Sequence, residues 1–248
     1  MKKISILLFC LIGGLHGSAQ VFIEMNAQGQ DFKGSWTVYG SQNFNKSIPD
    51  EKLTGSKFWN EEWQLATLFA ADSVLLGRLY VRYNLLNQEI HFKDLEGNEK
   101  VAAPDMLRVA VLHPGKDITK ITTVFRNDLS DVVINNKPVK CYLEELNRDD
   151  YRLMKLHRKE LMVMDARFGT EKKYELRDKL DYFIASNNRV VHLKKLSAEN
   201  VLELLPRSAG LKPVIKEEGL SLKSEKDVVK LLKIYDGHIK KSTAGKAE

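Results

Sequence analysis

The chain has 248 residues, 43% of them hydrophobic and 29% charged, with a formal net charge of +6. Residues 1–19 carry two Lys and no acid, and residues 207–248 carry ten Lys and Arg against six Asp and Glu, so the part between them is electrically neutral. A neutral body without an RNA-binding or helix-turn-helix signature excludes a dedicated nucleic-acid-binding protein, and we expect no nucleic-acid partner.

Residues 1–19 have the pattern of a signal peptide. Met1 to Lys3 is positively charged, Ile4 to Leu15 is apolar, and Gly17 to Ala19 supplies small residues for cleavage after Ala19. No segment of the mature chain approaches the roughly 18 apolar residues that a spanning helix needs, so we expect no transmembrane segment there. The sequence therefore predicts an exported protein in the periplasm, at the cell surface or outside the cell, with a retained N-terminal anchor as the alternative.

Cleavage would also remove one of the two cysteines. Cys141 would remain alone, so the mature chain could form no internal disulfide and would depend on a hydrophobic core for stability. Cys141 alternates with Lys140 and Tyr142 in a strand-like pattern, which predicts a small buried side chain rather than a nucleophile.

Residues 20–54 are rich in Gln, Asn, Gly, Ser and Lys and predict an extended N-terminal arm. From residue 55 the pattern is that of β-strands. Gly77, Leu79, Val81 and Tyr83 alternate with the polar face Arg78, Tyr80 and Arg82, and a second strand follows over 89–93. Asn84 and Asn87 suit the reversal between them, because Asn side chains bond to nearby backbone and tolerate left-handed dihedrals.

Turn residues recur at short intervals over the rest of residues 55–195, which predicts an antiparallel β domain of short strands. Further strands are expected over 107–112, 121–125, 139–146, 151–157, 161–168, 182–185 and 190–193. Ser186 to Arg189 predicts a tight hairpin. The fold class is mainly β (α+β overall), either an antiparallel β-meander or a curved sheet or barrel, followed by C-terminal helices.

After residue 195 the apolar period changes from two to about three and a half. We expect a helical segment over 196–237, packed on the sheet, with helices at 198–205, at 213–218 and from Ser224 to Gly237. Ser224 and Asp227 have the spacing of a capping box. Residues 238–248 are expected to form a disordered basic tail.

Several segments resemble a group of exported, largely uncharacterised β-rich proteins of Bacteroidota-type bacteria. The segments are 55–63, 81–84 with 89–90, 182–184 through 193–195, and the closing helix with Tyr235 and Asp236. The resemblance implies export and a β-rich fold, and it implies no catalytic residues.

The sequence lacks the common catalytic and metal-binding motifs, including His-Glu-x-x-His, Cys-x-x-Cys, Gly-x-Ser-x-Gly and the phosphate-binding loop. The mature histidines are His91, His113, His157, His192 and His238, and no two have the close spacing of a metal pair. We therefore expect no catalytic residue, metal or cofactor. A hydrolase remains open, because catalytic groups on distant strands can meet in space.

Arg78, Tyr80 and Arg82 are the candidate binding residues, because Arg and Tyr are enriched where proteins contact partners. The alternative is a solvated strand face with cross-strand pairs to a residue such as Glu89. Ser73 is a candidate modification site, since Asp72-Ser73-Val74 resembles a short O-glycosylation acceptor pattern of this bacterial group.

Met154, Met162 and Met164 either line an apolar cavity or belong to the core, and core packing is the favoured interpretation. The predicted function is that of an exported, non-enzymatic cell-envelope protein that binds an unknown partner. The alternative is a periplasmic carrier of a lipid or other apolar ligand, which would need a continuous pocket on the order of several hundred Å³.

Overall fold

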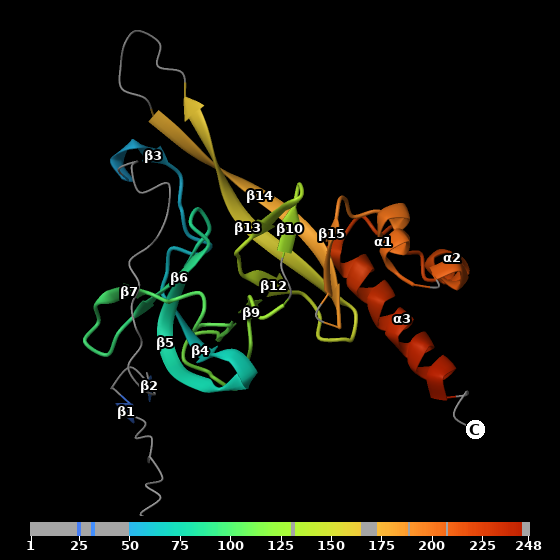
Figure 1. The fold of residues 1–248 in the computed structure, drawn as a ribbon, viewed down its shortest axis with the longest axis horizontal. Helices are drawn as coiled ribbons and strands as arrows, with labels where there is room; N and C mark the ends of the chain where they lie inside the picture. Colours follow the sequence, from blue (N-terminus) through green and yellow to red (C-terminus); the bar gives the residue numbers. More distant parts are fainter. Residues whose placement is uncertain are drawn as a thin grey trace, which may run out of the picture.

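The computed structural model describes residues 24–25, 31–32, 50–129, 132–164, 173–187, 189–206 and 208–244. The predicted signal peptide over 1–19 and its cleavage site lie outside the described residues. Figure 1 shows a curved sheet at one end, helices at the other, and a long ribbon of two strands running between them.

The strands are β1 Glu24–Met25, β2 Asp31–Phe32, β3 Leu53–Thr54, β4 Gln64–Phe69, β5 Leu75–Asn84, β6 Glu89–Lys93, β7 Glu99–Val101, β8 Val109–Leu112, β9 Thr123–Arg126, β10 Val132–Ile134, β11 Lys137–Val139, β12 Leu143–Glu145, β13 Arg152–Met164, β14 Lys173–Ser186 and β15 Arg189–Leu193. The helices are α1 Ala198–Leu204, α2 Leu211–Glu217 and α3 Glu225–Ala244. The fold is therefore mainly β with C-terminal helices, as the sequence predicts.

The main sheet has the order β1-β2-β5-β4-β8-β9-β12-β13-β14-β15, with β6 also on β5, β7 on β6 and β3 on β14. The pairing of β3 with β14 is parallel, so the sheet is mixed although largely antiparallel. The described pieces of the predicted N-terminal arm thus join the sheet as short strands. Strands β10 and β11 form a separate hairpin.

The sheet curves but does not close, so the barrel alternative is wrong. The turn that follows β5 reaches the outer edge of β13 through two hydrogen bonds. Lys159 donates its backbone N–H to the Leu85 carbonyl at 3.2 Å, and Gln88 Nε2 donates to the His157 carbonyl at 2.9 Å. These contacts connect the two sides of the curve without strand pairing.

Strands β5 and β6 form as their alternation predicts. Leu79, Val81 and Tyr83 are buried, whereas Arg78 and Arg82 on the opposite face are half-buried. Asn84 turns the chain by accepting hydrogen bonds from the backbone N–H groups of residues 86 and 87 at 3.1 and 3.2 Å. The tight hairpin between β14 and β15 is confirmed as well, since Ser186 pairs with Arg189.

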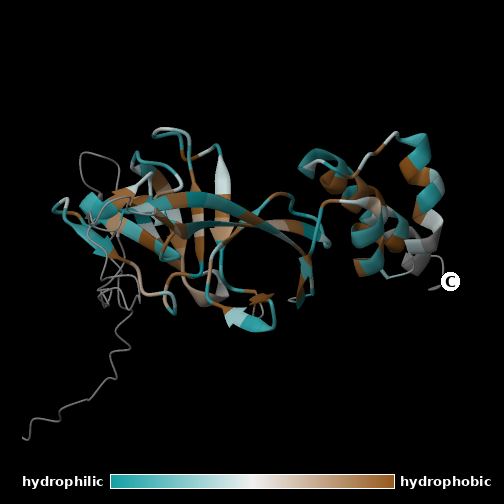
Figure 2. Ribbon diagram, turned by 90° about the horizontal axis from the view of Figure 1, so that it is seen from above, coloured by the Kyte–Doolittle hydropathy of each residue, from teal (hydrophilic) through white to brown (hydrophobic). Residues whose placement is uncertain are grey.

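Among the residues that the structure describes, three hydrophobic clusters stabilise the fold. The largest lies among β4, β5, β6 and β8 and includes Phe125 and Tyr142. A second packs the helices against β13, β14 and β15, and its sheet residues are Leu153, Ile184 and Leu193. Figure 2 shows the apolar sides of the helices turned toward one another. The third contains Cys141, which is 7% exposed, so the predicted burial of this residue is confirmed. Burial raises the pKa of the Cys141 thiol to about 12.

Two expectations about the strands are wrong. The separate strands expected over 151–157 and 161–168 form one continuous strand, β13, because β14 pairs with it in unbroken register from Arg152 to Met164. The strand expected over 139–146 is divided between β11, which pairs with β10 in a separate hairpin, and β12, which joins the main sheet.

The helices begin close to where their caps predict. Ser197 accepts a hydrogen bond from the backbone N–H of Asn200, and Ser224 accepts one from that of Asp227 at 3.2 Å. The end of α3 is different, because the helix continues through Gly237 to Ala244. A glycine inside a helix costs only about 1 kcal/mol, and Ile239 packs beyond it against the helical cluster. The predicted disorder is therefore wrong for residues 238–244, and residues 245–248 lie outside the described residues.

Asp236 joins α3 to the loop between β12 and β13. Its side chain is buried, and Oδ2 accepts a hydrogen bond from the backbone N–H of Tyr151 at 3.1 Å. The neighbouring Tyr235 ring packs edge to face on Tyr151, with centroids 4.9 Å apart. Burial raises the pKa of Asp236 above its ordinary value, the backbone hydrogen bond opposes this, and the nearby negative charge of Asp150 adds to it.

We predict that Asp236→Asn raises the melting temperature at pH 7. The variant removes the buried charge but keeps an oxygen that accepts the Tyr151 hydrogen bond. The pKa of Asp236 is higher in the folded state than in the unfolded state. As the pH falls through the interval between these two pKa values, the wild type gains stability, by about 1.4 kcal/mol for each unit by which they differ. The difference in melting temperature between Asp236→Asn and the wild type should therefore disappear near pH 3. Circular dichroism melts over a pH series measure this difference.

Asp227→Asn is the control with the opposite sign. Hydrogen bonds from Ser221, followed by the backbone N–H of Leu222, lower the pKa of Asp227. The wild type therefore has this stabilisation at neutral pH and loses it on acidification. Asp227→Asn should lower the melting temperature at pH 7, and a fall for Asp236→Asn as well would contradict the assignment of Asp236.

Candidate functional site

The three candidate binding residues lie together on the outer face of β5, where the structure leaves them half-buried. Arg78 is opposite Thr67 of β4, and Tyr80 is opposite Leu65. Arg82 is opposite His91 of β6. The predicted face thus exists, but its members differ in how firmly they are held.

Arg82 is clamped between two aromatic rings. Its guanidinium carbon lies 4.0 Å from the centroid of Phe58 and 4.2 Å from that of Trp63. Its Nη2 donates to both carboxylate oxygens of Glu99, at 3.1 and 3.0 Å. The side chain is only 16% exposed. We call Phe58, Trp63, Arg82, His91 and Glu99 the Arg82 cluster.

The segment before β4 places the two rings. Ser56 Oγ accepts the backbone N–H of Phe58 at 3.0 Å and fixes the turn there. Phe58 then forms a β-bridge with Asn84, and the Trp59 N–H donates to the Tyr83 carbonyl at 2.9 Å. The chain therefore runs along the end of β5 and reaches Trp63 next to Arg82.

Glu99 on β7 is the acidic centre of the Arg82 cluster. Besides Arg82 it bonds His91 Nδ1 at 2.6 Å. Burial alone would raise the pKa of Glu99, but the hydrogen bond to His91 and the charge of Arg82 outweigh it and lower that pKa below its ordinary value. The expected cross-strand partner was Glu89, whereas the structure pairs Arg82 with Glu99, one strand further across the sheet.

A second polar cluster, which the sequence did not predict, lies where the helices meet the sheet. Glu144 on β12 bonds His157 Nε2 at 2.6 Å. Glu225, in the first turn of α3, bonds Lys155 Nζ at 3.0 Å and accepts from the Tyr182 hydroxyl at 2.7 Å. Burial alone would raise the pKa of Glu225, but these two hydrogen bonds lower it below its ordinary value. The cluster fixes the start of α3 to the sheet.

The His157–Glu144 pair has the form of a base and its orienting carboxylate. The His157 ring, however, faces Trp59 and Phe125 edge to face. No hydroxyl or thiol of the described residues is hydrogen-bonded to it, so the His157–Glu144 pair activates no nucleophile there. His113 does bond a hydroxyl, that of Thr67 at 2.7 Å, but His113 is only 3% exposed. Likewise, the described residues contain no group of three or more His, Cys, Asp or Glu arranged to hold a metal ion.

A narrow crevice opens beside the Arg82 cluster. It is lined by Trp59, Asn60, Glu62, Gln64, Val81, Arg82, Tyr83, Ile90, Leu112 and Phe125. Its free volume is about 10 Å³, close to the space of one water molecule. Behind the crevice, the rings of Tyr83 and Phe125 pack against each other, with centroids 4.9 Å apart.

The remaining candidates lie apart from the Arg82 cluster. Ser73 is exposed at the turn between β4 and β5, with φ of 59°. Met154 is fully buried, but Met162 and Met164 are 40% and 48% exposed. The expectation that all three pack in the core is therefore wrong for two of them, because β13 extends beyond the hydrophobic clusters.

Comparison of the chain with protein-family models, with curated proteins and with solved structures finds no match. No helix among the described residues has the length and apolar character needed to cross a bilayer.

We predict that Arg82→Lys lowers the free energy of unfolding by about 1–2 kcal/mol, because an ammonium group cannot stack between two rings and bond both oxygens of Glu99. Urea titration measures the change. Trp63→Leu should remove part of the same interaction, so the two substitutions combined should cost less than their sum.

Arg177→Lys is the matched control. Arg177 is 58% exposed and pairs with Glu175 at the surface, so its replacement should leave the free energy of unfolding nearly unchanged. Equal losses in the free energy of unfolding for Arg82→Lys and Arg177→Lys would contradict the proposed stabilisation by the stacking of Arg82 between Phe58 and Trp63.

Proposed function

We propose that the chain is an exported, non-enzymatic protein of the cell envelope that binds another protein through the outer face of β5. Export is supported by the pattern of residues 1–19. The binding face is supported by the Arg82 cluster, which holds an arginine and a tryptophan in fixed positions beside Arg78 and Tyr80.

The Arg82 cluster is the observation that carries the proposal. Arg, Trp and Tyr contribute disproportionately to protein–protein binding energy. Phe58 and Glu99 hold Arg82 in one conformation, so little side-chain entropy remains to be lost on binding. Lys93 Nζ, 5.0 Å from the centroid of the Trp63 ring, adds a further cation at the same surface.

The described residues around the crevice pack closely, which supports a binding protein over a carrier. The crevice lined by Trp59 and Phe125 has room for about 10 Å³. A lipid carrier needs a continuous apolar pocket on the order of several hundred Å³. A hydrolase has less support, because His157 is hydrogen-bonded to no hydroxyl or thiol among the described residues and His113, which bonds the Thr67 hydroxyl, is only 3% exposed.

We predict that the mature protein, purified from its own envelope, carries a non-covalent protein partner in native mass spectrometry. The variant Arg78→Ala/Tyr80→Ala should lose at least about nine-tenths of this complex, because it removes two contact side chains at the interface. Arg82 is left unchanged, so that the clamp and the fold are preserved.

Glu199→Ala/Glu203→Ala, two exposed positions on α1, is the matched control and should retain the partner. Circular dichroism checks that both variants fold. A partner retained by the β5 variant would contradict the proposed face. A small apolar ligand that leaves on denaturation would instead support the carrier, and a bare chain in every sample would contradict a stable complex.

We also propose that Ser73 is glycosylated. Ser73 and Val74 are both exposed at the β4–β5 turn, with Val74 58% exposed, so a transferase can reach the hydroxyl. We predict an added mass that persists after denaturation and that Ser73→Ala abolishes, as measured on the intact chain. An unmodified mass for the native protein would contradict this.

A further inference from the structure

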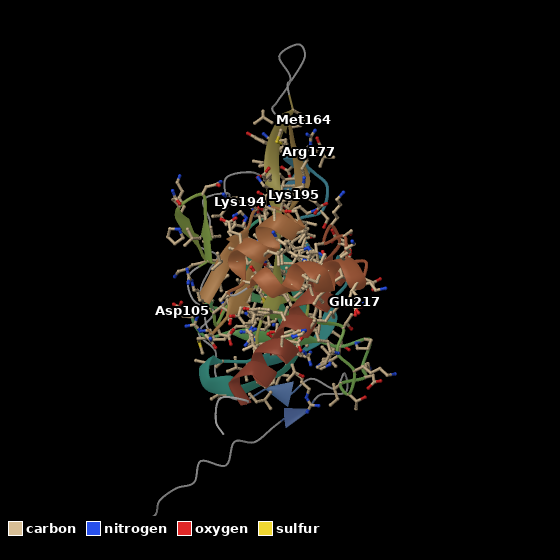
Figure 3. All side chains as sticks on the ribbon, turned by 90° about the vertical axis from the view of Figure 1, so that its right-hand side faces the viewer. Asp105, Met164, Arg177, Lys194, Lys195 and Glu217 are labelled. Atoms are coloured by element: carbon tan, nitrogen blue, oxygen red, sulfur yellow. The ribbon has the colours of Figure 1, made fainter. Side chains whose placement is uncertain are left out.

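The ribbon of β13 and β14 has an outer edge that is covered over only part of its length. β12 pairs with β13 at Met154 and Lys155. The turn after β5 then bonds His157 and Lys159. Beyond Lys159, no strand of the described residues pairs with this edge, and β13 continues to Met164 beside β14 alone. Figure 3 places Met164 at the far end of the ribbon, near Arg177.

The direction of the unpaired peptide groups follows from the alternation of the antiparallel ladder. Successive residues of such a strand point their N–H and C=O groups alternately to one neighbour and to the other. The Lys159 N–H and the His157 carbonyl both point away from β14. The pairing with β14 has no register shift, so Leu161 and Val163 also direct their peptide groups outward.

This free edge is apolar as well as unpaired. Met162, Val163 and Met164 are 40%, 58% and 48% exposed. Natural proteins protect exposed edges with charged side chains, prolines or bulges. Residues 161–164 contain none of these, so the edge is suited to pairing with another strand.

We propose that a second copy of this chain pairs with the edge, antiparallel and about a two-fold axis at Met162. In this register Leu161 is opposite Val163 of the second copy, and both outward-facing residues of each copy form hydrogen bonds. A shift that placed Leu161 opposite itself would bring Val163 opposite Lys159, whose N–H is already bonded to Leu85. The proposed register therefore uses only free peptide groups, and the interface is the same on both subunits, as two-fold symmetry requires.

The side chains agree with self-pairing. Met162 lies opposite Met162 of the second copy, and apolar contacts form on both faces of the joined ribbons. Glu160 is opposite Met164 of the second copy, so no like charges face each other over 160–164. The result is a continuous sheet across both copies in which the two β13 strands are central and are flanked on each side by β14 and then β3.

Cross-linking tests the register. Met162 and its symmetry mate would form a non-hydrogen-bonded pair with Cα atoms about 4.5 Å apart, within the range of a disulfide. Met162→Cys, in a Cys141→Ala background, should therefore form a disulfide-linked dimer under mild oxidation. Met164→Cys is the control, because it has similar exposure but faces Glu160 of the second copy.

We expect Met162→Cys to cross-link at least about tenfold faster than Met164→Cys on non-reducing gels. Equal rates, or no cross-linked dimer from either variant, would overturn the proposal.

Light scattering tests the association without a thiol. The wild type should be dimeric, and Val163→Pro should be monomeric, because proline removes an outward N–H without removing a bond to β14. Val163→Lys keeps the N–H and adds a charge at the edge, and it should also dissociate the dimer if the proline variant fails to fold. A monomeric wild type at about 100 μM, or a dimer of the folded Val163 variants, would overturn the proposal.

Discussion

The structure depends on the stacking of Arg82 between Phe58 and Trp63, with Glu99 closing the site. Four elements meet there: the segment before β4, then β5, β6 and β7. A guanidinium group can fill this position because it is planar, weakly hydrated and able to bond a carboxylate from its edge. Without it, the Phe58 and Trp63 rings would have no common partner, and β7 would keep its pairing with β6 but lose its direct side-chain contact with β5.

The position of the turn after β5 follows from the same arrangement. Phe58 bridges to Asn84, and the Leu85 N–H donates to the Lys57 carbonyl at 2.8 Å, so the segment that supplies the rings also fixes the turn. Leu85 and Gln88 of this turn also form hydrogen bonds with β13. The Arg82 cluster therefore helps to position the turn between β5 and β6, and that turn links the two sides of the curved sheet.

Local features of the fold could be predicted from the sequence, whereas long-range pairings could not. The alternation in β5, the Asn84 turn and the Ser197 cap each depend on neighbours within a few residues. The choice of Glu99 over Glu89 depends on the register of β7, and Glu225 meets Lys155 only after α3 packs on β13. The end of α3 was missed because a local signal, Gly237, is overridden by packing of Ile239.

The free edge of β13 is a consequence of unequal strand lengths. β12 covers two of its residues, and the turn after β5 supplies only two further hydrogen bonds, because β5 reverses at Asn84. β14 by contrast pairs with all thirteen residues of β13. A strand that is longer than the elements along one of its edges must leave part of that edge unpaired, and here the unpaired part is the apolar stretch from Leu161 to Met164. The same contacts, those of β12 and of the turn after β5 with β13, therefore both hold the sheet in its curve and leave the end of β13 unpaired.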